Sequence, residues 1–156
     1  MKKKILFVDD DEDILFAYRM AVESDETAVY TACDANSTLD IVKQTNIDLA
    51  VLDYMMPGLK GDELALQIKT INPDVKIFFV SGYDIALKAV KQLDVSVYGV
   101  FMKPVDLETL RSIVETDYDS VDYHTIIANA GNLYSNFYAE DNPHITNLKN
   151  LKFLAQ

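Results

Sequence analysis

The sequence predicts an α/β fold: an open, doubly wound, five-stranded parallel sheet with a helical extension at its C-terminal end. Short aliphatic runs alternate with segments whose apolar residues recur every three or four positions, which is typical of strands covered by helices on both faces. Five such units fit into about 115 residues, so the connections suit right-handed crossovers within one sheet. With 156 residues, 49% of them hydrophobic, the chain can bury one substantial core.

The elements follow one another in a regular order. The run ILFV predicts a first strand at residues 5–8, and the acidic residues after it suit a helix N-terminus. The helix itself is predicted by apolar residues at helical spacing: Ile14, Leu15, Tyr18, Ala21 and Val22. Three further units have predicted strands at 28–33, 48–52 and 76–80 and predicted helices at 37–44, 63–71 and 85–93. A fifth strand at 98–102 precedes Asp106, the predicted N-cap of a last helix.

Charge and cysteine content exclude several classes of protein. The net charge is −11, and three lysines at residues 2–4 are too few to bind nucleic acid phosphates. The apolar run at 5–8 is too short for a signal peptide or a membrane span, so we expect no membrane association. Cys33 is the only cysteine in the sequence; we expect a buried core thiol, without any intrachain disulfide, in a cytoplasmic protein.

Five polar residues follow the predicted strands at their carboxyl ends: Asp9, Asp10, Asp53, Ser81 and Lys103. Because parallel strands end at one edge of a sheet, these side chains are expected to converge there. Each acid alone is more often merely solvated, but five compatible groups at one edge make that interpretation improbable. Clustered carboxylates need a counter-charge, and oxygen ligands favour Mg²⁺. A carboxylate beside Mg²⁺, a hydroxyl and an ammonium group can attack phosphorus, so the sequence predicts an aspartyl-phosphate site.

Four motifs in order give the chain a family resemblance: VDD at the first strand end, LDYMMPGLKG around the third, FFVSG at the fourth and FMKP at the fifth. With them, residues 1–117 resemble the receiver domain of bacterial two-component response regulators, which has a flavodoxin-like fold. The resemblance implies that Asp53 is the phosphoacceptor and Asp10 a direct Mg²⁺ ligand. It also implies that Asp9 acts on the metal largely through water, and that the backbone carbonyl of Met55 completes the protein ligands.

The resemblance also assigns the residues around the phosphoryl group. Ser81 matches the hydroxyl that turns toward that group, and Lys103 matches the lysine that pairs with it. Gly82 would leave space beside Asp53, Gly61 would close the loop before the third helix, and the bond from residue 103 to Pro104 would be cis. The family usually has an aromatic residue three positions before the lysine, as part of its switch. Val100 stands there, so the Ser81 half of the switch is expected to act without it.

The implied function is a phosphoacceptor switch. A sensor histidine kinase or a phosphotransfer protein would supply the phosphoryl group, and the chain would promote its own phosphorylation and dephosphorylation rather than act as a dedicated enzyme. Signalling would run through protein contacts, with homodimers formed by the face of the fourth helix, fifth strand and fifth helix, or by the tail. The motifs name no particular downstream partner.

Three alternatives compete with this function. A haloacid-dehalogenase-like phosphatase would also use a DxD and an aspartyl-phosphate, but it leaves Asp53 and the sequence after it unexplained. An EF-hand at residues 9–20 lacks the turn glycine, which is Ile14 here, and the bidentate glutamate, which is Met20. The third is an interaction module driven by its tail without phosphorylation. Residues 118–156 are expected to form a helical extension with no recognisable output domain, because two apolar stripes flank Asn142 and Pro143.

Overall fold

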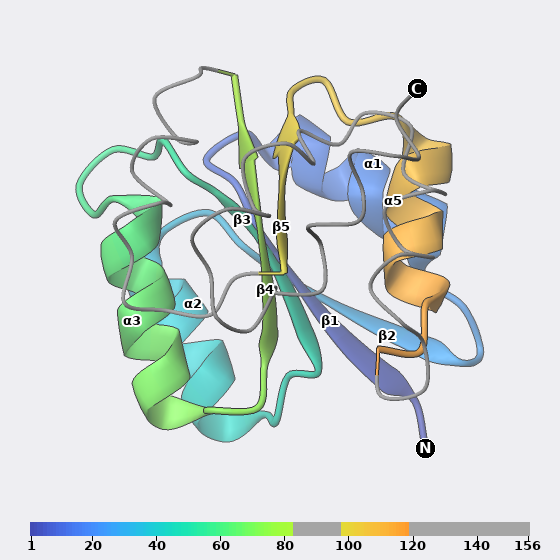
Figure 1. Ribbon diagram of the computed structural model, residues 1–156, viewed down its shortest axis with the longest axis horizontal. Coiled ribbons are helices and arrows are strands. Elements are labelled where there is room, and N and C mark those ends of the chain that lie inside the picture. The colour runs from blue at the N-terminus through green and yellow to red at the C-terminus, as the bar shows by residue number, and fades with distance from the viewer. Residues whose placement is uncertain (83–97, 119–156) are drawn as a thin grey trace, which may run out of the picture.

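The computed structural model describes residues 1–82 and 98–118, and within them five strands form one parallel sheet in the order β2-β1-β3-β4-β5 (Figure 1). The strands are β1 (Lys3–Val8), β2 (Thr27–Ala32), β3 (Leu49–Asp53), β4 (Lys76–Ser81) and β5 (Gly99–Met102). The described helices are α1 (Glu12–Val22), α2 (Ala35–Gln44), α3 (Gly61–Ile71) and α5 (Leu107–Glu115). The predicted doubly wound sheet is confirmed. The predicted helix at 85–93 and the extension beyond residue 118 lie outside the described residues.

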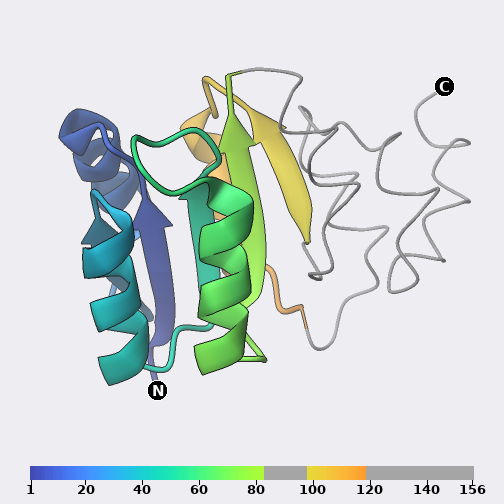
Figure 2. The same ribbon diagram turned by 90° about the vertical axis from the view of Figure 1, so that its left-hand side faces the viewer.

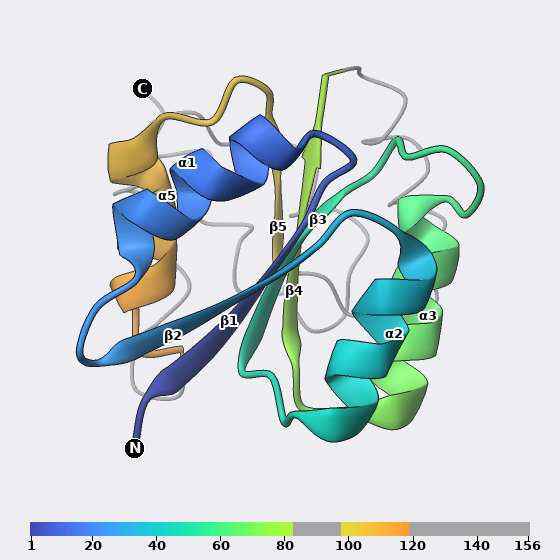
Figure 3. The ribbon, with the colours of Figure 1, turned by 180° about the vertical axis from the view of Figure 1, so that it is seen from behind.

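Helices cover both faces of the sheet, as Figure 2 shows in side view. On one face, α2 and α3 pack over a cluster that includes Leu6, Leu52 and Phe79. On the other face, α1 and α5 pack over a cluster that includes Phe7, Val51 and Phe101. Adjacent residues of each strand enter opposite clusters, because successive strand side chains point to opposite faces. Figure 3 shows the two pairs of helices and the sheet from behind. The edge strands of the sheet are β2 and β5.

Aspartates begin three of the four described helices. The side chain of Asp11 accepts hydrogen bonds from the backbone N–H groups of Asp13 and Ile14, and that of Asp34 accepts one from Ser37 N. Asp106 Oδ1 accepts one from Thr109 N at 2.8 Å, so its predicted role as N-cap is confirmed. Because a cap satisfies N–H groups that the helix leaves free, Asp34 lets α2 start at Ala35, two residues before the predicted start.

One prediction about the core is wrong. Cys33 was expected to be buried in the second strand, but β2 ends at Ala32 and the Cys33 side chain is exposed. Its Sγ lies 3.9 Å from Asp34 Oδ2, at the start of α2. The physical reason is the position of β2 at the edge of the sheet, where the residue that follows the strand already meets solvent. None of the described helices is long and apolar enough to cross a membrane.

The strand order places its switch point at β1. The chain passes from β1 to β2 on one side and then to β3 on the other, so β1 lies between them. In open α/β sheets, ligands bind where the strand order reverses in this way, beyond the carboxyl ends of the strands. Asp9 and Asp10 directly follow β1, and Asp53 is the last residue of β3.

Candidate functional site

The strand alternation brings three ionisable side chains to one side of the sheet edge. Phe7, Val51 and Phe101 all pack in the cluster under α1 and α5. Residues two positions further along each strand continue on the same face, and these are Asp9, Asp53 and Lys103. The expected convergence of these three residues is therefore found, although they come from three different strands.

Lys103 bridges the two buried carboxylates. Its Nζ lies 2.7 Å from Asp9 Oδ2 and 3.0 Å from Asp53 Oδ2. Asp9 is 2% exposed and Asp53 5%, whereas the Lys103 side chain keeps a quarter of its surface in solvent. Both carboxylates therefore depend on this lysine for charge compensation, because bulk water scarcely reaches them.

Burial and pairing shift the two sides of this bridge in different ways. Burial raises the pKa of Asp53, and the hydrogen bond and charge of Lys103 offset only part of that rise. Burial lowers the pKa of Lys103, but two carboxylates outweigh it, so the net shift of the lysine is also upward. The two pKa shifts differ in their causes because Asp53 shares the Lys103 cation with Asp9, whereas Lys103 interacts with both acids. Lys103 is therefore held firmly in its charged form, whereas burial makes the charged form of Asp53 less stable than that of an exposed aspartate.

The carboxylates of Asp9, Asp10 and Asp53 could hold a metal ion. One oxygen from each lies within 4.8 Å of the others, and Asp10 is exposed to solvent while the other two are buried. Oxygen donors of this kind are those that a hard divalent cation prefers, so the donor set fits the expected Mg²⁺.

The loop after β3 is held close to the site. Met55 N donates to Asp53 Oδ1 at 3.1 Å, so Met55, expected as a backbone ligand, lies beside the acid. Gly61 N donates to Tyr54 O at 3.0 Å, which closes the loop as expected. A Cβ on Gly61 would lie 2.7 Å from Tyr54 Cα, closer than real contacts allow, so a glycine is required for this approach.

Ser81 and the residues near it are placed at the same edge. Ser81 ends β4 with 1% exposure, and its carbonyl accepts a hydrogen bond from Lys103 N at 2.9 Å. The Lys103–Pro104 bond is cis, as the resemblance implies. Val100 is buried in the cluster under α2 and α3. A Cβ on Gly82 would meet nothing within 4 Å among the described atoms, so the space at this position is open.

The bond between Lys103 and Asp9 was not predicted. The motifs assign this lysine to a phosphoryl group, whereas the structure gives it a second acidic partner 94 positions away. The signal for it was the shared strand alternation, because Phe7 and Phe101 are both aromatic core residues two positions before the pair.

A parallel sheet whose strand ends carry three carboxylates and a lysine fits the class of phosphoacceptor signalling domains. The family model for the response regulator receiver domain matches residues 5–115, so the chain belongs to this family. Receiver domains are signalling switches of two-component systems rather than dedicated enzymes. The phosphatase and the tail-driven module are not favoured by this match.

Known relatives agree with the family. The chain is 32% identical over 110 residues to response regulator MprA of Mycolicibacterium vanbaalenii, a match that covers 70% of this chain and 48% of that protein. It is 26% identical over 115 residues to sporulation initiation phosphotransferase F of Bacillus subtilis, covering 74% of this chain and 93% of that one. The match thus spans about half the length of MprA.

Solved structures share the fold. A CheY-like receiver domain protein from Methanospirillum hungatei superposes with a TM-score of 0.63 at 27% identity, covering 74% of this chain and 92% of that one. The receiver domain of DrrB activated with BeF3 superposes with a TM-score of 0.64 at 24% identity, over 74% of this chain and 96% of that one. At that identity, the second likeness concerns the fold alone.

Proposed function

We propose that residues 1–117 accept a phosphoryl group on Asp53 from a sensor histidine kinase or a phosphotransfer protein. The observation that carries this proposal is the bridge of Lys103 Nζ between Asp9 and Asp53 beside a third carboxylate, Asp10. One lysine is thus shared between two buried acids, with a third acid beside them. The carboxylate oxygens of Asp9, Asp10 and Asp53 would hold Mg²⁺, together with the Met55 carbonyl.

The chemistry follows from the contacts of Asp53. Its Oδ1 accepts the Met55 N–H and its Oδ2 binds Lys103, so the carboxylate is held in one orientation toward the sheet edge. One of these oxygens would attack phosphorus, forming an O–P bond while the N–P bond of a donor phosphohistidine breaks and the imidazole leaves with the electron pair. Lys103 would then pair with a phosphoryl oxygen, and the Ser81 hydroxyl would donate to another. When bound, Mg²⁺ would neutralise the remaining oxygens.

The output would be a change in protein contacts. The added charge would bias the face formed by β5, α5 and the segment predicted as a helix at 85–93, which would serve a target or a homodimer. With Val100 buried in place of an aromatic residue, the Ser81 hydroxyl would carry the local part of the switch. Residues 118–156 would add a helical extension and a second route to a dimer. We place the exchange in the cytoplasm, where ATP supplies the kinase.

The assignment is tested by labelling with acetyl phosphate, a small phosphodonor, in the presence of Mg²⁺. Asp53→Asn should abolish incorporation, because an amide oxygen is a poor nucleophile toward phosphorus, and chelation of the metal should do the same in the wild type. Asp48→Asn is the matched control, since Asp48 Oδ2 accepts a hydrogen bond from Lys4 N at 2.7 Å, at the other end of the sheet. Labelling of Asp53→Asn at the wild-type level would contradict the proposal.

A further inference from the structure

A buried tyrosine, Tyr18, lies in the core that supports the site. Tyr18 belongs to α1 and is 7% exposed, with its ring centroid 5.2 Å from that of Phe7. Within residues 1–82 and 98–118, its hydroxyl makes no direct hydrogen bond. A buried hydroxyl without a partner costs free energy, so a leucine or phenylalanine would serve the packing better. The hydroxyl is therefore a donor that the described side chains and backbone leave available.

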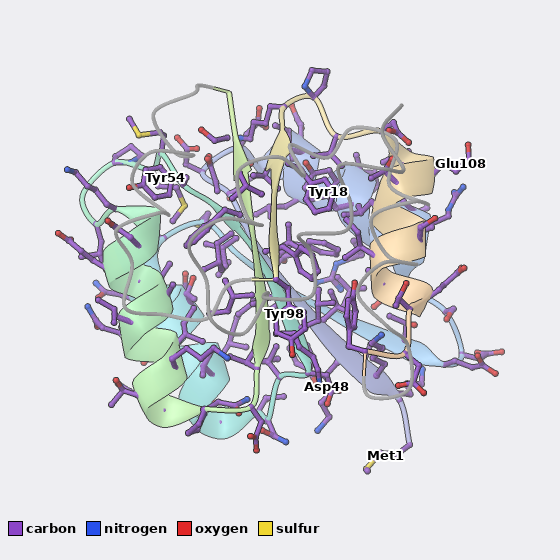
Figure 4. All side chains as sticks on the ribbon, viewed as in Figure 1. Met1, Tyr18, Asp48, Tyr54, Tyr98 and Glu108 are labelled. Atoms are coloured by element: carbon purple, nitrogen blue, oxygen red, sulfur yellow. The ribbon has the colours of Figure 1, made fainter. Side chains whose placement is uncertain are left out.

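The geometry directs Tyr18 toward the strand ends. Helical side chains lean toward the N-terminus of their helix, and α1 begins at Glu12, just after the site acids. The ring packs on Phe7, and Asp9 lies two positions further along the same strand face. Figure 4 shows Tyr18 between β5 and α5, on the half of the molecule where the strands end.

The charges of the site reach this hydroxyl. Burial raises the pKa of Tyr18 to about 12; the next contributions are Asp9, which raises it, and Lys103, which lowers it. The phenol is therefore a neutral donor at physiological pH. Of the acids at the site, Asp9 has the larger influence on Tyr18 and Asp53 the smaller.

Asp9 is the acid that would need this donor. Its Oδ1 accepts from Asp11 N at 2.9 Å and its Oδ2 from Lys103 Nζ at 2.7 Å. On the proposed function, on which this inference rests, Lys103 turns to the phosphoryl group once Asp53 is modified. Asp9 is only 2% exposed, so solvent scarcely replaces the lysine at Oδ2. Mg²⁺ held by the site acids would balance the charge of Asp9, but the hydrogen bond from Lys103 to Oδ2 would be lost. Tyr18 carries a hydroxyl on the same face of the sheet.

We propose that Tyr18 is a positioning residue of the phosphoacceptor site, whose hydroxyl donates to Asp9 when Lys103 moves to the phosphoryl group. The bond holds the Asp9 carboxylate in place in the phosphorylated state and is absent in the resting state. The hydroxyl thus favours the phosphorylated state selectively, which is the condition for an effect on the switch.

The test compares Tyr18→Phe with Tyr118→Phe, a matched loss of a buried hydroxyl. Tyr118 packs in the same cluster, and its hydroxyl donates to Ile113 O at 2.7 Å in the resting structure. Melting temperatures are measured in the full chain without additions and with Mg²⁺ plus beryllofluoride, which stands in for the phosphoryl group. The rate of phosphorylation by acetyl phosphate is the second readout.

Tyr18→Phe should keep or raise the resting melting temperature, and beryllofluoride should raise it less than in the wild type. Phosphorylation should slow about fivefold, the factor that corresponds to about 1 kcal/mol of hydrogen bonding in the modified state. Tyr118→Phe should lower the resting melting temperature and keep the full beryllofluoride increase. A full increase in Tyr18→Phe would overturn the inference alone. A wild type that does not respond to beryllofluoride would overturn the proposed function and this role of Tyr18 with it.

Discussion

Two partly buried lysines lie at opposite ends of the sheet and are satisfied in different ways. Lys3 opens β1, and its Nζ donates to the carbonyls of Val114 and Thr116, each at 2.6 Å, at the end of α5. The same Nζ lies 5.3 Å from the centroid of the Tyr118 ring. Lys103 follows β5 and is held by the carboxylates of Asp9 and Asp53. Among the described contacts, Lys3 binds backbone carbonyls and a ring, whereas Lys103 binds two carboxylates.

The difference separates a structural lysine from a chemical one. The carbonyls at the end of α5 are part of the backbone and carry the negative end of the helix dipole, so they form a fixed site for a cation. Tyr118 is further held by Phe78 and Tyr98, with ring centroids 5.7 and 5.5 Å away. Carboxylates can instead exchange one cation for another or bond to phosphorus. The contacts of Lys3 at the amino end of the sheet are therefore fixed, whereas those of Lys103 at the carboxyl end can be exchanged for others.

The largest expected effect comes from removing the chemical lysine. Lys103→Met should slow phosphorylation by acetyl phosphate at least about 100-fold, as loss of a charge-stabilising group does in other active sites. It should also destabilise the resting protein, because Asp9 and Asp53 would be left buried together without their cation. Labelling rates and urea unfolding measure the two effects. A variant that is labelled at the wild-type rate would show that Lys103 is as structural as Lys3.

A smaller effect of another kind is expected at Lys3. Lys3→Met should lower the free energy of unfolding by about 2 kcal/mol, since it removes two charge-assisted hydrogen bonds and a cation–π contact from a partly exposed position. Phosphorylation should be unchanged in the folded variant. If Lys3→Met slowed labelling as much as Lys103→Met does, the two ends of the sheet would be coupled and the contrast between them would fail.

The smallest effect is a change in pH dependence. Burial is the main reason that the pKa of Asp53 lies above its ordinary value of 3.8, and Lys103 offsets part of this rise. Between these two values the folded state holds the proton more tightly than the unfolded state, so this group makes stability fall as pH rises. The Asp53→Asn variant cannot ionise at this position, so it does not lose stability in this way as pH rises. Its unfolding free energy relative to wild type should therefore increase as pH rises above about 3.8 and level off above the raised pKa.

Urea unfolding of both proteins across the acidic range measures this difference. A relative stability that falls with pH would mean that Lys103 lowers the pKa of Asp53 by more than burial raises it. The carboxyl end of the sheet would then be as fully satisfied at rest as the amino end, where Lys3 has its fixed partners.

The sequence alone determined the layers of the fold and the edge at which the chemistry lies. All five residues of β3 are buried, and its continuous apolar run is typical of a strand that is covered on both faces of a parallel sheet. Asp53 had to end that strand, as Asp9 had to follow β1, because both places are set by neighbours in the chain. Helix starts shifted by up to two residues where a cap such as Asp34 took over.

Only the tertiary structure decided which of these groups meet. Asp9 and Lys103 are 94 positions apart, and their contact depends on strand order, on register and on α1 and α5 sharing one face. The exposure of Cys33 likewise depends on β2 being an edge strand, which no property of the residue itself reveals. Local patterns report the burial of a segment relative to its own neighbours. Pairing and exposure at the strand ends depend on distant segments, whose arrangement is fixed only when the sheet is assembled.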